Sequence, residues 1–338
     1  NKRKVGALFR STTSIAIALV LVLGVSGTGA ASTPVQTTAQ TSNVLQAKPN
    51  VVSSPAAKPK FLKNFNMRKI TRLSVASLNR YVKSNSVAKP HKIVFQDTIP
   101  AAERKWITRI AQASVAALPI KAGEVPLIVV GSTDAFINET LNSNGKPGNS
   151  PDWCGRPTTY EAYCAGAGWA AMNYKDSIER GAPIFDLGRR AVVAHEIFHV
   201  WHKAVDGSPG NNNRDPRLPE GIPLWFAEGN ANFFGFAMAQ ISLKDSYRSG
   251  RATQVDTYMQ SSTRPLKDHI FWDTNPYGIG QAAAEYLVAS VGMQKVMDVY
   301  VKIGAGQTFA TAFQDSIGIS VDEFYTLFES VRGNFTKW

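Results

Sequence analysis

With 338 residues, the chain leaves roughly 250 ordered residues once its N-terminal segment is set aside, which is enough for one large domain or two small ones. Its formal charge of +12 suggests affinity for anionic surfaces such as cell-wall polymers or acidic substrates, although a net charge can also serve solubility alone. The chain carries no basic run with interleaved aromatic residues, no zinc finger and no RNA-binding motif, so nucleic-acid binding is excluded as its function.

Residues 1–31 have the pattern of a secretory signal peptide. Four basic residues precede an apolar stretch from Ile15 to Val25, and small residues around Ala30 supply a cleavage site. The apolar stretch is short for a transmembrane helix. We therefore expect a secreted or cell-envelope protein, with an uncleaved N-terminal membrane anchor as the alternative.

Two further segments precede the expected main domain at 91–338. Residues 32–60 contain neither aromatic nor acidic residues, and their Ser, Thr, Ala, Gln, Val and Pro are typical of a disordered linker or pro-segment. Spaced apolar residues predict a helix within 61–90 (Phe61, Phe65, Ile70, Leu73, Leu78 and Tyr81). This helix either packs on the domain that follows or belongs to an inhibitory pro-segment.

The first part of the main domain mixes strands and helices. We expect strands at 91–98, 125–130, 168–174 and 183–187, and helices at 101–118 and 133–141. Between them, Cys154 and Cys164 are the only cysteines, and an even count behind a secretion signal favours one disulfide. Residues 206–219 read as a loop, and nearly all of the chain after Pro223 reads as helix.

The most informative motif is H-E-x-x-H, which runs from His195 to His199 within an apolar stretch free of Gly and Pro. On a helix, residues four apart lie one turn above each other on the same face, so the two imidazoles can hold one Zn²⁺. Glu196 then lies near the water that the metal binds, as a general base. The pattern predicts a zinc hydrolase, most simply a peptidase, with one zinc per chain.

A catalytic zinc takes three protein ligands and keeps one position open. The third histidine of metzincins would fall at Val205, so that class is excluded. Glu228 lies in the middle of an apolar helix that Pro223 can start, where a carboxylate is costly unless it is paired or bound to metal. We expect Glu228 to be the third ligand, and Glu220, in a loop before two prolines, is its competitor.

These motifs resemble the peptidase MA-like family, in the gluzincin group of zinc metallopeptidases. The matching text is A-H-E-I-F-H-V at 194–200 and L-P-E-G-I-P-L-W-F-A-E-G-N-A at 218–231, with looser likeness at 275–292 and 309–324. The resemblance implies an α+β, zincin-like fold: an N-terminal lobe with a small sheet, a helical C-terminal lobe, and zinc between them. It also implies that an edge strand from 168–187 pairs with an extended protein or peptide substrate.

The resemblance also implies roles for individual residues. His195, His199 and Glu228 would bind zinc, and Asn232, where many members carry Asp, would support a zinc histidine without adding charge. Tyr277 would stabilise the transition state, and His269 is a second candidate for that role. Two other functions stay open: a catalytically inactive secreted binding or adhesion protein on the same scaffold, and a zinc hydrolase of cell-wall material.

Overall fold

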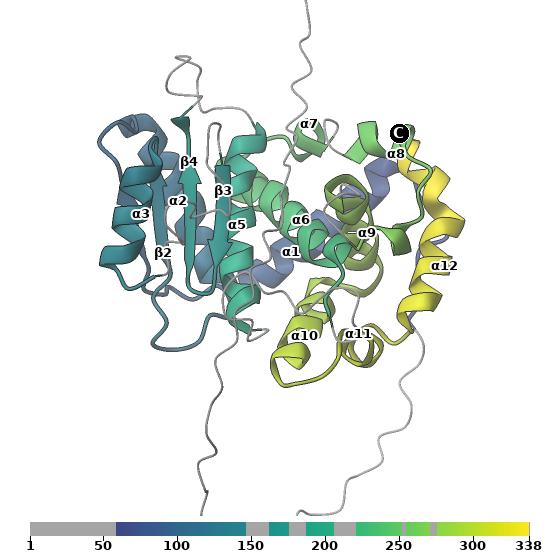
Figure 1. Cartoon of the computed structure of the whole chain (residues 1–338). Helices are drawn as coiled ribbons and strands as arrows, with labels where there is room; N and C mark the ends of the chain where they lie inside the picture. Colours follow the sequence, from purple (N-terminus) through teal and green to yellow (C-terminus); the bar gives the residue numbers. More distant parts are fainter. Residues whose placement is uncertain are drawn as a thin grey trace, which may run out of the picture.

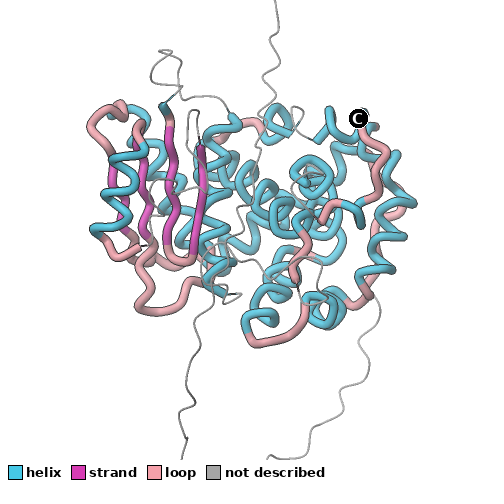
Figure 2. Tube along the Cα trace, viewed as in Figure 1, coloured by secondary structure: helices cyan, strands magenta, loops and turns pink. Residues whose placement is uncertain are grey.

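A four-stranded sheet stands at one side of the protein, and helices form most of the rest (Figures 1 and 2). The structure, a computed structural model, describes residues 59–146, 162–175, 187–205, 221–251, 255–270 and 276–337. The expected α+β class is therefore present, with helix predominating. The predicted signal peptide, nearly all of the predicted linker, Cys154, the expected strand at 183–187 before Leu187 and the loop at 206–219 lie outside the described residues.

The sheet has the order β1-β2-β4-β3. Its strands are β1 (Lys92–Phe95), β2 (Leu127–Gly131), β3 (Ala162–Gly166) and β4 (Trp169–Asn173). β1, β2 and β4 run parallel, and β3 returns antiparallel to β4 through a tight turn in which Gly168 takes a φ of +77°. The expected strand at 168–174 is thus confirmed, but it lies inside the sheet. The edge strand expected within 168–187 is therefore not β4, because the hairpin partner β3 pairs with its outer side.

Helices cover both faces of the sheet, and the alternation of side chains along β2 shows how. Leu127 and Val129 pack on one face with Ile137 and Leu141 of α3 (Asp134–Ser143). Ile128 and Val130 point to the opposite face and join the main core, to which α2 (Ala101–Ala117) and α5 (Leu187–Val205) contribute. Because β2 is buried on both faces, its sequence is a continuous run of apolar residues and does not alternate between apolar and polar ones.

The remainder of the chain is a helical assembly around α6, shown in green to yellow in Figure 1. α6 has almost every side chain buried because other helices surround it, and it runs beside α5 and α9. A Cβ on Gly229 of α6 would lie 2.2 Å from the backbone carbon of Gly280 on α9, so these two helices touch backbone to backbone. The elements are α6 (Leu224–Leu243), α7 (Tyr247–Arg251), α8 (Thr257–Ser261), α9 (Pro276–Val291), α10 (Met293–Gly304), α11 (Phe309–Ile317), α12 (Val321–Val331) and 3₁₀ turns at Leu266–Asp268 and Arg332–Thr336.

The predicted helix within 61–90 is present as α1 (Met67–Asn85) and shares the main hydrophobic core. Ile70 and Leu78 are fully buried, and the Ser77 hydroxyl accepts a hydrogen bond from the backbone N–H of Met293 at 3.0 Å. The backbone N–H of Met67 donates to the carbonyl of Lys337 at 2.7 Å, which ties α1 to the end of the chain. These contacts make α1 a packed element of this fold.

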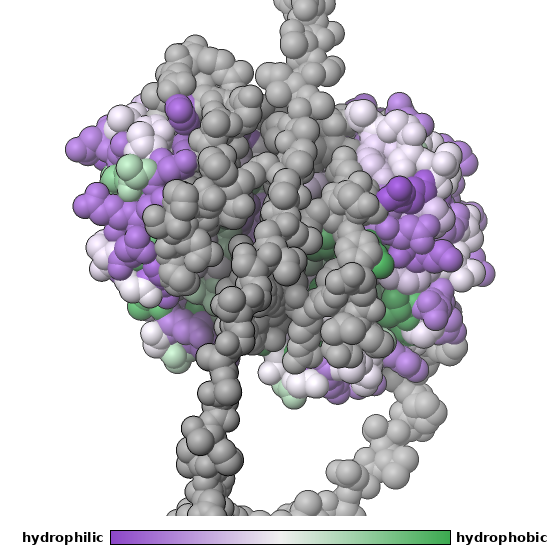
Figure 3. Space-filling model, viewed as in Figure 1, coloured by the Kyte–Doolittle hydropathy of each residue, from purple (hydrophilic) through white to green (hydrophobic). Residues whose placement is uncertain are grey.

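The outer surface differs from the interior as expected for a folded domain. On the face drawn in Figure 3, the surfaces near α3 and α12 are mostly hydrophilic, and hydrophobic residues show toward the middle. None of the described helices combines the length and the apolar character needed to cross a lipid bilayer.

Candidate metal centre

Two neighbouring helices, α5 and α6, bring the three expected metal ligands together. His195 and His199 lie one turn apart on α5, as the four-residue spacing predicts, and Glu228 lies in the second turn of α6. All three side chains are buried, with 5–7% of their surface exposed. They form the one group of three or more histidine, cysteine or acidic residues suited to hold a metal ion that the described part of the chain contains.

The three ligand atoms form a small triangle. Nε2 of His195 and Nε2 of His199 are 2.9 Å apart, and Oε2 of Glu228 lies 3.3 Å and 3.2 Å from them, respectively. A tetrahedral ion with bonds of about 2.0–2.1 Å holds its ligand atoms about 3.3 Å apart. The triangle therefore fits a small divalent cation, and two imidazoles with one carboxylate suit zinc as well as other first-row metals.

The charge of this group favours metal binding. Burial raises the pKa of the Glu228 carboxyl, but the charge and hydrogen bonds of the two imidazoles outweigh it and lower that pKa overall. Burial lowers the pKa of His195, yet the carboxylates of Glu228 and Glu196 outweigh burial there and raise it. The cluster thus holds a buried carboxylate that needs positive charge beside it, from protons or from a metal ion.

Glu196 lies beside the triangle without belonging to it. Its Oε1 is 3.9 Å from Nε2 of His195, and 6% of the residue is exposed. Burial raises the pKa of the Glu196 carboxyl, and the charges of the two nearby imidazoles oppose that shift only in part. A carboxylate in this position can take up a proton next to a bound metal without occupying a coordination position.

Asn232 supports the first histidine. Its Oδ1 lies 2.8 Å from Nδ1 of His195, and an amide oxygen can only accept, so the Nδ1–H of the imidazole donates. This fixes the tautomer in which Nε2 offers its lone pair toward Glu228 and His199. The geometry is the one expected from the position of Asn232, four residues after Glu228 on the same helix face.

His202 supports the second histidine, a role that the sequence interpretation missed. Its Nδ1 lies 3.0 Å from Nδ1 of His199, and only 2% of the residue is exposed. Burial, helped by the charges of His199 and Lys203, lowers the pKa of His202 well below its ordinary value, so the ring is neutral and can accept the Nδ1–H of His199. A third histidine three residues after the motif, on the same helix, was the available signal.

The two candidates for transition-state stabilisation have different surroundings. Tyr277, at the start of α9, places its ring 6.3 Å from the ring of His195, so it borders the metal centre. His269 is fully buried, and its Nε2 lies 2.9 Å from the hydroxyl of Tyr258. The carbonyl of His269 accepts the backbone N–H of Trp225, which positions the start of α6. The described contacts thus place the Tyr277 ring beside the candidate site, and they place His269 at the start of α6, the helix that carries Glu228.

Two other expectations from the sequence fall on residues that the structure leaves undescribed. Glu220, the competitor for the third ligand, is one of them, and Cys154 is another, so the predicted disulfide with Cys164 stays a prediction. Cys164 itself lies on β3 and packs against the smaller cluster between the sheet and α3.

Comparison of the chain with protein-family models, with curated proteins and with solved structures finds no match. The resemblance to the peptidase MA-like family therefore rests on the sequence motifs quoted above alone.

Proposed function

We propose that this chain is a secreted, zinc-dependent peptidase of gluzincin type. The observation that carries the proposal is the buried triangle of Nε2 of His195, Nε2 of His199 and Oε2 of Glu228, with sides of 2.9–3.3 Å and Glu196 next to it. Burying ionisable groups this close together lowers the stability of a fold unless the groups are paired or bind an ion.

Each residue of the group has a distinct task in this proposal. A zinc ion held by the triangle would supply a Lewis acid that makes a water molecule nucleophilic and polarises the substrate carbonyl. Glu196 accepts the proton of the attacking water and passes it to the leaving amine. Asn232 and His202 hold the two imidazoles in the tautomer and orientation that metal binding needs.

Tyr277 completes the proposed chemistry. Its ring borders His195, and in this proposal its hydroxyl donates a hydrogen bond to the oxyanion that develops on the substrate carbonyl. His269 is the weaker candidate, since its ring is fully buried and hydrogen bonded to Tyr258.

The arrangement of the elements supports a zincin-like architecture. The H-E-x-x-H helix α5 packs against β3 and β4 on one side and against α6 on the other, so the ligands lie where the sheet-bearing part meets the helical part (Figure 1). β3 is an edge strand of the described sheet and neighbours α5, and an extended peptide would pair with this strand.

The test is metal content and turnover of two variants. We expect about one zinc per chain in the wild type, loss of zinc in Glu228→Ala, and retained zinc with abolished peptide cleavage in Glu196→Gln. Elemental analysis and a fluorogenic peptide library measure the two properties separately. Absence of zinc from the reconstituted wild type would refute the metal centre. A metal-loaded wild type that cleaves cell-wall material but no peptide would refute the substrate class.

A further inference from the structure

A buried polar network surrounds Glu285 in the second half of α9, and the chemistry proposed above does not use it. Arg251, Gln281 and Glu285 have no exposed surface, and Tyr247 and Asp256 are exposed by only 3% and 8%. Charged side chains are almost never buried this deeply unless they are paired. The network therefore requires an explanation beyond the general packing of the helices.

Two residues of α7 hold the carboxylate of Glu285. Nε of Arg251 lies 2.9 Å from each of its two oxygens. The hydroxyl of Tyr247 donates a hydrogen bond to Oε1 of Glu285 at 2.6 Å and accepts one from Nε2 of Gln281 at 3.2 Å. The guanidinium group of Arg251 also pairs with Asp256, which precedes α8. These bonds connect α7 to α9 through side chains.

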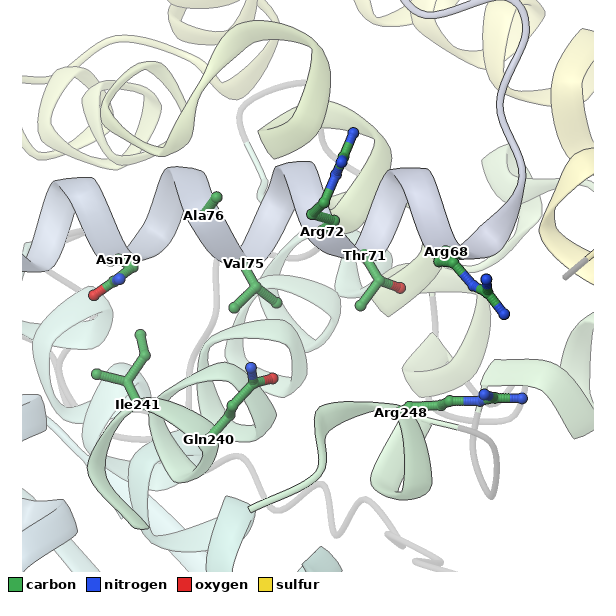
Figure 4. A pocket seen from close by; sticks show the side chains of 9 residues that line it. All are labelled: Arg68, Thr71, Arg72, Val75, Ala76, Asn79, Gln240, Ile241 and Arg248. Atoms are coloured by element: carbon green, nitrogen blue, oxygen red, sulfur yellow. The ribbon is translucent and has the colours of Figure 1, made fainter. Parts of the chain in front are cut away.

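α7 also contacts the start of α1. Figure 4 shows Arg248 of α7 near Arg68, and both residues line the hollow between α1 and α6. Three residues later, Arg251 is buried, and its Nη2 lies 3.4 Å from the sulfur of Met67. The Arg251–Glu285 ion pair thus joins α9 to a segment that is itself held in place by α1.

Stability alone does not account for this network. The attraction within a buried ion pair only roughly offsets the cost of removing two charges from water, and apolar side chains of the same volume are often as stable. A buried ion pair does restrict geometry, because a small displacement leaves a charge or a donor without a partner in the interior. The network is therefore suited to fixing the position of α9.

The face of α9 that carries the network also carries Tyr277. Tyr277, Gln281 and Glu285 follow one another at intervals of four residues, which places them on one face of the helix. Side chains on a helix lean toward its N-terminus, so Gln281 leans over the turn that begins at Tyr277. The Tyr277 ring lies 6.3 Å from the ring of His195. A rotation of α9 that moved this ring away would also break the hydrogen bonds of Gln281 and Glu285.

At their closest point, α6 and α9 do not fix this rotation. The contact there consists of the bare backbones of Gly229 and Gly280. Packed helices resist rotation where the side-chain ridges of one fit into the grooves of the other, and two glycines offer no ridge. The glycine contact therefore sets the separation of the two helices and leaves their rotation to contacts elsewhere along α9.

We propose that Glu285, through its bonds to Arg251 and Tyr247, is a positioning residue that fixes the rotation of α9 and so holds the ring of Tyr277 beside His195. Its effect on turnover rests on the role given to Tyr277 in the proposed function, whereas its effect on the place of the ring does not. None of the described contacts of Glu285 reaches the three metal ligands, so it acts through Tyr277.

The test compares two variants that each remove one buried tyrosine hydroxyl. Tyr247→Phe removes the donor to Glu285 and keeps the aromatic ring. Tyr286→Phe is the matched control, because Tyr286 is the next residue on α9 and its hydroxyl donates instead to the carbonyl of Leu62. Both variants lose one hydrogen bond, but only the first loses a bond of the network.

The first readout is fluorine NMR of the full chain labelled with 3-fluorotyrosine, which reports the surroundings of each tyrosine ring without turnover. The Tyr277 signal is assigned by its loss in Tyr277→Phe. We expect Tyr247→Phe to shift this signal by more than its linewidth at unchanged metal content, and Tyr286→Phe to leave it in place. If Tyr247→Phe does not fold, Arg251→Lys replaces it, because lysine keeps the charge but lacks the Nε–H that bonds both oxygens of Glu285.

Turnover gives a second readout, which a loss of packing alone would not produce. Tyr247→Phe should lower kcat roughly ten-fold with little change in KM, because a small misplacement of a catalytic group slows the chemical step. In the Tyr277→Phe background the same change should have no further effect, since no hydroxyl remains there to be misplaced.

Three results would overturn the proposal. They are a Tyr277 signal that stays in place in both Tyr247→Phe and Arg251→Lys, a signal that Tyr286→Phe moves equally far, and a loss of kcat that persists undiminished in the Tyr277→Phe background. A wild type that cleaves no peptide, with a Tyr277 signal that Tyr247→Phe still moves, would refute the proposed function and support the placement of the ring by Glu285.

Discussion

The side-chain oxygen of Asn232 lies 2.8 Å from Nδ1 of His195, and both residues belong to the inner faces of adjacent helices. The amide oxygen of Asn232 fixes the tautomer of the imidazole, as a carboxylate at the same position would. Unlike a carboxylate, it adds no negative charge. We expect Asn232→Ala to weaken metal affinity about 10–100-fold. Asn232→Asp should retain the hydrogen bond and bind metal at least as tightly as the wild type. Competition with a chromogenic chelator measures both, and equal affinity in Asn232→Ala would contradict the assignment.

His202 gives a second, separable prediction about metal affinity. Its ring packs beside Phe198 and Tyr300, with ring centroids 6.2 Å and 5.7 Å away, so phenylalanine is a compatible replacement. His202→Phe removes the acceptor for the buried Nδ1–H of His199, so we expect metal affinity to fall about ten-fold and the metal-free chain to lose about 1–3 kcal/mol of stability. A variant with unchanged metal affinity would show that His202 serves packing alone.

Tyr277 is expected to act in turnover and not in metal binding. Removing one hydrogen-bond donor to an oxyanion costs about 10²–10³ in kcat in well-studied enzymes, and Tyr277→Phe should lose turnover of this order. Metal content and KM should stay close to those of the wild type, because the phenyl ring keeps its contact with His195. Steady-state kinetics on the best peptide found in the library separate kcat from KM. A rise in KM alone would place Tyr277 in substrate binding.

A buried tyrosine predicts how stability depends on pH. The hydroxyl of Tyr286 donates to the carbonyl of Leu62 at 2.9 Å, and burial raises its pKa to about 12 from the ordinary value near 10. In the unfolded chain the proton leaves near pH 10, so above that pH the unfolded state binds fewer protons and the free energy of unfolding falls as pH rises. This stabilisation is complete below pH 10 and is lost as pH rises through about 12.

Urea titrations at several alkaline pH values test this expectation. Tyr286→Phe should be less stable than the wild type near neutral pH by about 1 kcal/mol, because one hydrogen bond is lost. Between pH 10 and 12 it should lose stability less steeply than the wild type. Burial also raises the pKa values of Tyr81 and Tyr325 to about 12, so some slope should remain in the variant. Parallel slopes would exclude a contribution from Tyr286.

Local patterns allowed much of the candidate site to be predicted. The spacing of His195 and His199 fixes a shared helix face, and the isolated carboxylate of Glu228 in an apolar helix signals a partner, so the ligand triangle follows once α5 and α6 pack together. The packing of α5 against α6 depends on contacts between residues far apart in the sequence, which local patterns do not reveal. The contact of His202 with His199 depends on the ring orientation that packing imposes, and the sequence shows only a third histidine nearby.

The sheet shows the same limit. Apolar runs predict β2 and β4 as strands, but the order β1-β2-β4-β3 depends on hydrogen bonds between residues far apart in sequence. The short turn at Ala167 and Gly168, which folds β3 back onto β4, decides that β4 lies inside the sheet. His269 is a similar case, because its position in a loop suggests contact with solvent. In the structure its carbonyl accepts the backbone N–H of Trp225 at the start of α6, and its ring is hydrogen bonded to the hydroxyl of Tyr258.

The contact between Gly229 and Gly280 has a consequence for finding relatives of this chain. Gly229 directly follows Glu228, the expected third ligand, and Gly280 follows Tyr277 by three residues. The close contact of these two glycine backbones therefore sets the distance between α6, which carries Glu228, and α9, which carries Tyr277. A side chain at either position would push apart the two groups that the proposed chemistry needs close together. A remote relative that shares this centre should therefore carry small residues at both places, and E-G followed at a distance by Y-x-x-G is a more selective signature than H-E-x-x-H alone.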